Sequence, residues 1–94
     1  MREADALEPV NIEIAYSEPE LQVMLNLKLP ATTSVYDAVV QSGIADKYPQ
    51  IDLDKQALGI FGKIVRKPQA QLIKQGDRIE IYRPVIVVEE TPSQ

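Results

Sequence analysis

Two alternating stretches near the start of the chain constrain its fold more than any other feature. In residues 10–16 and again in residues 21–29, an apolar side chain occupies every second position. Because successive side chains of a β-strand point to opposite faces, both stretches are typical of half-buried strands. The polar residues 17–20 between them predict a turn, and Pro30 is expected to end the second strand because proline cannot donate to a ladder. The sequence therefore predicts a β-hairpin at the start of the fold.

A short amphipathic helix is predicted directly after this hairpin. Thr33 or Ser34 is suited to cap its first turn, and Gly43 is suited to end it. Three apolar residues share one face of this helix: Val35, Ala38 and Val39. A helix of about ten residues is marginal on its own, so we expect it to pack against the sheet.

The second half of the chain predicts three further extended segments, at residues 58–61, 64–65 and 78–82. Gly62-Lys63 is expected to form a turn or bulge between the first two of them. Residues 44–57 are expected to be mostly loop, with turns and room for one short helical turn. The resulting order is strand, strand, helix and then three strands. It predicts an α+β domain, in which one helix packs across a mixed sheet and the first and last strands lie at the centre.

The chain is expected to form one domain, because 94 residues leave little room for a second. Residues 1–8 are polar and are expected to be a flexible N-terminus, and residues 89–94 a polar tail. The domain itself is then expected to span residues 9–88.

Composition excludes several classes of function. The chain has no cysteine and no histidine, which excludes disulfides, thiolate metal sites, cysteine nucleophiles and histidine acid–base catalysis. A net charge of −4 argues against nucleic acid as a partner, because nucleic-acid affinity depends on Lys and Arg neutralising phosphates. The carboxylate pair Asp52 and Asp54 is expected to serve turn chemistry. The sequence therefore predicts no enzyme activity, no cofactor and no bound metal.

The chain also carries no signal for a membrane. No run of about 18 apolar residues is present, and the charged N-terminus has no apolar signal region. We therefore expect a cytoplasmic protein without direct membrane insertion.

The predicted order of elements is that of the β-grasp, or ubiquitin-like, fold. Residues 58–65 (LGIFGKIV) and 76–84 (GDRIEIYRP) resemble the RnfH family of small bacterial ubiquitin-like proteins, and the resemblance extends over residues 10–85. It implies a β-grasp fold and no known catalytic activity. The family names imply association with the Rnf electron-transport complex of the bacterial membrane or, alternatively, an antitoxin that pairs with a ribosome-associated toxin.

The same C-terminal half also looks like the ThiS and MoaD sulfur carriers, whose function depends on a terminal Gly-Gly. Residues 83–85 match the segment that leads to this diglycine, but Val87 and Val88 occupy the glycine positions in an approximate alignment. No glycine follows Gly76 in the sequence. Since a diglycine that is not encoded cannot be exposed by trimming, the sequence predicts that the chain is not a sulfur carrier.

Candidate interaction residues cluster around the two short strands and the last strand. Lys63 is either a solvated turn lysine or a partner contact fixed by a rigid turn. Tyr82 lies beside Arg83 and shares a strand face with Arg78, and it is either an interface anchor or packed on a loop. Phe61 is either a lone exposed residue or, with Met24 and Tyr82, part of an apolar patch on the open sheet face.

A run of apolar β-formers, residues 85–88, follows the last predicted strand. It either extends that strand along the sheet or adds to a partner or to a second copy of the chain, with Val85 and Val87 on one side. These residues and those above predict a non-catalytic protein-interaction module. It would dock an unidentified protein partner through the open sheet face and residues 78–88, with a homodimer through residues 85–88 as a further prospect.

Overall fold

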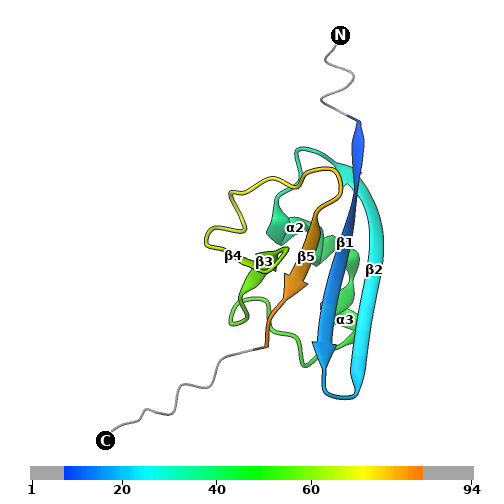
Figure 1. Ribbon diagram of the computed structural model, residues 1–94, viewed down its shortest axis with the longest axis vertical. Helices are drawn as coiled ribbons and strands as arrows, with labels where there is room; N and C mark the ends of the chain where they lie inside the picture. Colours follow the sequence, from blue (N-terminus) through cyan, green and yellow to red (C-terminus); the bar gives the residue numbers. More distant parts are fainter. Residues whose placement is uncertain (1–7, 84–94) are drawn as a thin grey trace, which may run out of the picture.

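The computed structural model describes residues 8–83 and shows one mixed sheet with two helices across one of its faces (Figure 1). The strands lie in the order β2-β1-β5-β3-β4. This is the α+β arrangement that the sequence predicts. The elements are β1 (Pro9–Glu18), β2 (Leu21–Pro30), α2 (Val35–Ser42), α3 (Ile44–Lys47), β3 (Leu58–Ile60), β4 (Lys63–Val65) and β5 (Arg78–Ile81).

The first and last strands form the centre of the sheet, as predicted from their apolar faces. β1 pairs with β2 in antiparallel and with β5 in parallel orientation, so that Ile14 lies opposite Leu25 on one side and Ile79 on the other. The hairpin turn is shorter than expected, because Glu18 already pairs with Leu21. The prediction of a four-residue turn was therefore wrong: backbone pairing continues into residues whose polar side chains do not reveal it.

Helix α2 begins and ends where the sequence predicts. The Ser34 hydroxyl accepts a hydrogen bond from the Asp37 N–H at 3.0 Å, and Gly43 takes a left-handed conformation with φ = 75° at the C-cap. The expected helical turn in residues 44–57 is α3, which follows Gly43 directly. It places Ile44 in the core with only 1% of its surface exposed.

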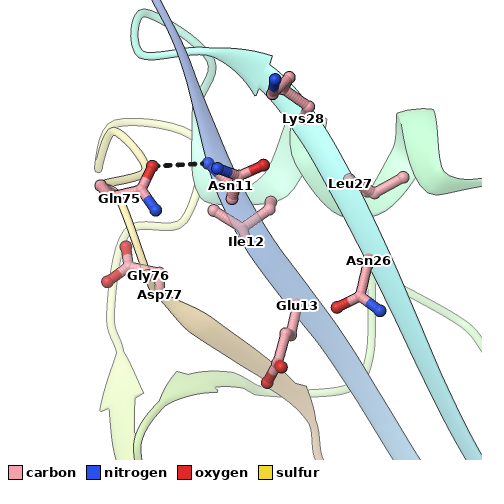
Figure 2. Close-up of a pocket in the computed structure, with 9 residues that line it drawn as sticks. All are labelled: Asn11, Ile12, Glu13, Asn26, Leu27, Lys28, Gln75, Gly76 and Asp77. Carbon is pink, nitrogen blue, oxygen red and sulfur yellow. Dashed lines mark hydrogen bonds between the residues drawn. The ribbon is translucent and has the colours of Figure 1, made fainter.

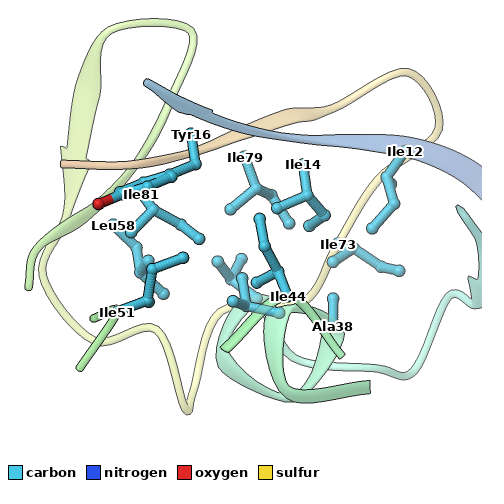
Figure 3. Close-up of a cluster of buried hydrophobic side chains, with 12 residues drawn as sticks. Ile12, Ile14, Tyr16, Ala38, Ile44, Ile51, Leu58, Ile73, Ile79 and Ile81 are labelled. Carbon is cyan, nitrogen blue, oxygen red and sulfur yellow. The ribbon is translucent and has the colours of Figure 1, made fainter. Parts of the chain in front are cut away.

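The core lies between the helices and one face of the sheet (Figure 3). Strands β1 and β5 contribute alternate residues to it, and α2 contributes the three residues of its predicted face. The apolar side chains of β2 are only half-buried, because β2 is an edge strand with a neighbour on one side. The fully packed members are Ile12, Ile14, Tyr16, Val35, Ala38, Val39, Ile44, Ile51, Leu58, Ile73, Ile79 and Ile81.

The β3–β4 hairpin differs from the prediction by one residue. Its two-residue turn is Phe61-Gly62, and both residues have positive φ, 49° and 84°. Such mirror-image turns match the right-handed twist of the paired strands, which is why they are favoured in tight hairpins. Phe61 therefore does not belong to the strand, and Lys63 is the first residue of β4 instead of a turn residue.

Candidate interaction surface

The face of the sheet opposite the helices carries a continuous row of paired residues, one from each of the five strands. The strand registers place Met24, Ala15, Glu80, Gly59 and Ile64 opposite one another in this order. Met24 is 48% and Ile64 57% exposed, so that each end of the row offers an apolar side chain to solvent. We call this surface the open face.

Tyr82 lies on the open face above the glycine of this row. A Cβ atom placed on Gly59 would lie only 2.4 Å from the Tyr82 hydroxyl and 2.7 Å from Cζ, so the ring occupies space that another residue at position 59 would fill. The hydroxyl donates a hydrogen bond to Glu80 at 2.7 Å, and the Tyr82 N–H donates to the carbonyl of Ala57 at 2.9 Å. Tyr82 is thus fixed by one hydrogen bond at its side-chain hydroxyl and one at its backbone.

The Tyr82–Glu80 contact also raises the pKa of the ring hydroxyl. The hydrogen bond to Glu80, followed by burial and the nearby negative charge of Glu80, raises the pKa of Tyr82 to about 12. The same Glu80 oxygen accepts the N–H of Gly62 at 2.9 Å, which fixes the carboxylate to the β3–β4 turn. Tyr82 therefore remains a neutral phenol near pH 7 and is a poor general base.

A hollow of about 730 Å³ adjoins the Tyr82 ring over β2, β1 and β5. Apolar and cationic groups meet in its lining, where Met24 and Tyr82 lie with Arg78 and Arg83. The Arg78 Nε lies 3.0 Å from a carboxylate oxygen of Glu13 on the neighbouring strand. Because both side chains of this ion pair are exposed, it contributes little to stability.

A second hollow, of about 450 Å³, lies beyond Glu13 at the other end of the open face (Figure 2). It is more polar. Asn11 and Lys28 line it from β1 and β2, and Gln75 closes it by accepting the Asn11 N–H at 2.9 Å. Together the two hollows make the open face an uneven surface with an apolar end and an amide-rich end.

A further cluster of hydrogen bonds holds the β1–β2 turn beside the apolar end. Glu18 accepts hydrogen bonds from the hydroxyl of Tyr16 and from the amide of Gln50, the latter at 2.9 Å. These bonds lower the pKa of Glu18, with a smaller contribution from the positive charge of Arg83. Burial, followed by the hydrogen bond to Glu18, raises the pKa of Tyr16.

Three of the predicted interaction residues, Arg78, Tyr82 and Arg83, gather around the same hollow with Met24. Tyr82 is packed on strand β3, and not on a loop as one alternative had it. The other predicted residues do not join this group. Phe61 is 63% exposed but lies in the hairpin turn.

Lys63 is exposed and pairs with Ile60, so it lies on the face opposite Ile64. Val85 and Val87 lie outside the described residues.

Ile64 is the residue that sequence reasoning missed. In a run of only two apolar residues, Ile64-Val65, the sequence does not reveal which of the two faces the core. Only the strand register shows that Ile64 lies on the open face.

Asp52 accepts the N–H of Asp54 at 3.0 Å, which is the turn chemistry that the sequence predicts for this pair. Between residues 8 and 83, no three acidic side chains are grouped in a way that could hold a metal ion. Neither helix in this part of the chain is long and apolar enough to cross a membrane.

Comparison with solved structures shows which fold this is. The chain superposes on ubiquitin from Caldiarchaeum subterraneum with a TM-score of 0.59 at 13% identity, over 83% of this chain and 96% of that one. The C-terminal ubiquitin-like domain of mouse tubulin-specific chaperone e gives a TM-score of 0.58 at 14% identity, over 89% and 95% of the two chains. The predicted β-grasp fold is thus confirmed.

Comparison of sequences identifies the family. The profile of the RnfH family ubiquitin matches residues 10–91. Protein RnfH of Pseudomonas aeruginosa strain LESB58 is 44% identical over 77 residues, which cover 82% of this chain and 76% of that protein. Protein RnfH of Hahella chejuensis is 43% identical over 76 residues, which cover 81% and 79%. This chain therefore belongs to the RnfH family of ubiquitin-like proteins.

Proposed function

We propose that this chain is a non-catalytic docking module that binds a partner protein through its open face. The observation that carries the proposal is the row between Met24 and Ile64, in which exposed apolar side chains flank a fixed tyrosine on a face that neither helix of the described residues covers. The open face is therefore the surface to test first.

The composition of the row suits an interface. Interface centres are enriched in Tyr, Met and Arg, and tyrosine and arginine are frequent hot spots. Tyr82 is held by hydrogen bonds at its hydroxyl and its backbone, so little rotamer freedom remains to be lost on binding. Arg78 and Arg83 flank it with positive charge, which favours a partner segment that combines an apolar anchor with acidic neighbours.

The residue chemistry supports a binding role over a catalytic one. A chain without histidine or cysteine lacks the side chains that most often act as general base or nucleophile near pH 7. Tyr82 could replace them only if its pKa were lowered, but the pKa is raised to about 12.

The first experiment compares capture of partners by the wild-type full chain and by variants of the open face. Tagged protein is incubated with cytosolic and membrane fractions, and bound proteins are identified by mass spectrometry. Components of the Rnf electron-transport complex and of ribosome-associated toxin systems, the partners that the family resemblance suggests, are the first to look for.

Matched variants make this comparison specific. Met24→Glu and Ile64→Glu place a charge at the two ends of the row. Val40→Glu and Leu72→Glu are the controls, since these residues are exposed to a similar degree, 48% and 49%, but do not belong to the row. We expect the two open-face variants to weaken binding of a captured partner by about tenfold or more, and the controls to leave it unchanged.

The proposal fails if the partner binds all four variants equally, or if the control variants lose it as well. It also fails if the purified protein shows a turnover that a single substitution abolishes. Circular dichroism of each variant separates loss of binding from loss of folding.

A further inference from the structure

Within residues 8–83, strand β2 leaves a long edge of the sheet without a neighbour. It runs for ten residues at the end of the strand order and pairs only with β1. Natural edge strands are usually protected by shortness, bulges, prolines or inward-pointing charges. Between Leu21 and Leu29 the only charged residue is Lys28, and proline occurs only at the end, at Pro30.

The hydrogen bonds of β1 show which backbone groups of β2 point outward. The N–H of Glu13 donates to Asp77 at 2.9 Å, so the odd-numbered residues of β1 face β5 and the even-numbered ones face β2. Since Ile14 lies opposite Leu25, the odd-numbered residues of β2 are those bonded to β1. The free edge is formed by the peptide groups of Gln22, Met24, Asn26 and Lys28.

This edge also has an apolar flank on the helix side of the sheet. Five aliphatic residues alternate along the strand and all remain half-buried: Leu21, Val23, Leu25, Leu27 and Leu29. Outside the β1–β2 ladder, no backbone hydrogen bond within residues 8–83 involves the four outward-pointing residues. The edge therefore combines unsatisfied backbone groups with apolar side chains that a neighbouring strand would cover.

We propose that the occupant of this edge is a second copy of the chain. Two β2 strands pair in antiparallel orientation about a two-fold axis at Leu25, which joins the two five-stranded sheets into one. The strand is self-complementary in this register. Leu25 lies opposite Leu25 of the second copy, residue 24 opposite residue 26, and residue 22 opposite residue 28. Outward-pointing residues therefore meet only outward-pointing residues.

The side chains match as well as the backbone does. On the open face Gln22 lies opposite Lys28 of the second copy, and Met24 lies opposite Asn26 of that copy. On the helix side every aliphatic residue faces another aliphatic residue. Lys28 also lies diagonally across from Glu20 of the second copy, and no like charges are opposed.

Neighbouring registers are less suitable. A shift by two residues in one direction leaves Lys28 without a partner on the strand. A shift in the other direction sets Gln22 opposite Pro30, which has no N–H to donate. The two-fold axis at Leu25 is thus the register that pairs all four outward-pointing residues with one another.

Such a dimer would display both open faces on the same side of the joined sheet, because its two-fold axis is perpendicular to the sheet. A partner with two binding segments would then be held bivalently. The dimer can be tested separately from the open-face proposal through Ile64, which lies on β4 at the far end of the strand order, whereas Met24 lies on β2 and belongs to both surfaces.

The test is sedimentation equilibrium of the full chain over a range of concentrations, with two opposite substitutions at one site. Gln22→Lys places a lysine opposite Lys28 of the other copy at two sites per dimer. Gln22→Glu places a glutamate at these two sites and creates two ion pairs instead. We expect the dimer dissociation constant to rise about tenfold for the first variant and to fall about tenfold for the second.

A backbone variant gives an independent test. The N–H of Asn26 points away from β1, so Asn26→Pro removes no ladder bond within the monomer but blocks the approach of a second strand. We expect this variant to be monomeric and folded by circular dichroism, and Asn26→Ala to dimerise like the wild type. Ile64→Glu should also dimerise normally.

Two results would overturn the proposal. One is a wild-type chain that stays monomeric up to millimolar concentration, whether or not the edge takes up a peptide of another protein. The other is a dimer whose dissociation constant is the same for both Gln22 variants, which would place the interface elsewhere, for example at residues 85–88.

Discussion

Replacement of Gly59 by alanine tests the packing at the centre of the open face. The added Cβ would lie 2.4 Å from the Tyr82 hydroxyl, whereas an ordinary contact begins at 3.4 Å. The ring must therefore move by about 1 Å. Glu80 cannot follow freely because it also accepts the Gly62 N–H, so we expect the 2.7 Å bond between Tyr82 and Glu80 to break.

The expected change in the free energy of unfolding combines the lost Tyr82–Glu80 hydrogen bond with one compensating gain from replacing glycine by alanine. A hydrogen bond to a charged group contributes about 1.5–3 kcal/mol, and the low end applies because the ring is partly exposed. Replacing glycine by alanine in a compatible strand restores about 0.5 kcal/mol through the unfolded state. The free energy of unfolding should thus fall by about 1 kcal/mol, which lowers the melting temperature by about 4–8 °C.

The assay is urea denaturation combined with a spectrophotometric titration of the four tyrosines. In Gly59→Ala the pKa of Tyr82 should fall from about 12 towards its ordinary value of 10.0. In a Tyr82→Ala background the same substitution should cost nothing, because the ring is absent. The reasoning is refuted if Gly59→Ala keeps the raised pKa, or if it destabilises both backgrounds equally.

Three further predictions concern single side chains. Tyr82→Phe loses the same hydrogen bond to Glu80 and should lower the free energy of unfolding by about 1.5 kcal/mol below pH 10, and by progressively less as the pH rises towards 12, because stability from a raised pKa is lost as the pH rises through the folded value. Urea denaturation of both proteins across this range checks the prediction, and a difference that persists at pH 12 would contradict it. Ser34→Ala should lower the free energy of unfolding by about 1 kcal/mol through loss of the α2 cap, whereas the exposed Thr32→Ala should be neutral in the same denaturation experiment. Phe61→Asn should raise the melting temperature by a few degrees, about 0.5–1 kcal/mol in stability, since asparagine tolerates a positive φ and the exposed ring loses little packing; a lower melting temperature would mean that the ring packs against the fold.

Much of the fold could be predicted from local patterns because these patterns follow from local chemistry. Alternation of apolar residues reveals β1 and β2, since each is covered on one face only. The Ser34 cap and Gly43 mark the ends of α2, because both act on backbone groups within one turn. Predictions failed where pairing between strands decided the outcome, as in the shorter β1–β2 turn and in the turn at Phe61-Gly62.

In the candidate surface, too, some features follow from the local sequence and others from the pairing of distant strands. The absence of histidine and cysteine is read directly from the sequence, and strand alternation is enough to place Arg78 and Tyr82 on the same side of the sheet, although β5 ends at Ile81, one residue earlier than predicted. Three features depend on the tertiary structure: Tyr82 lies over Gly59, Ile64 and not Lys63 reaches the open face, and within residues 8–83 no strand pairs with the outer edge of β2. These features depend on the register and order of strands far apart in the chain, which are set by packing of the common core and which no short stretch of sequence encodes.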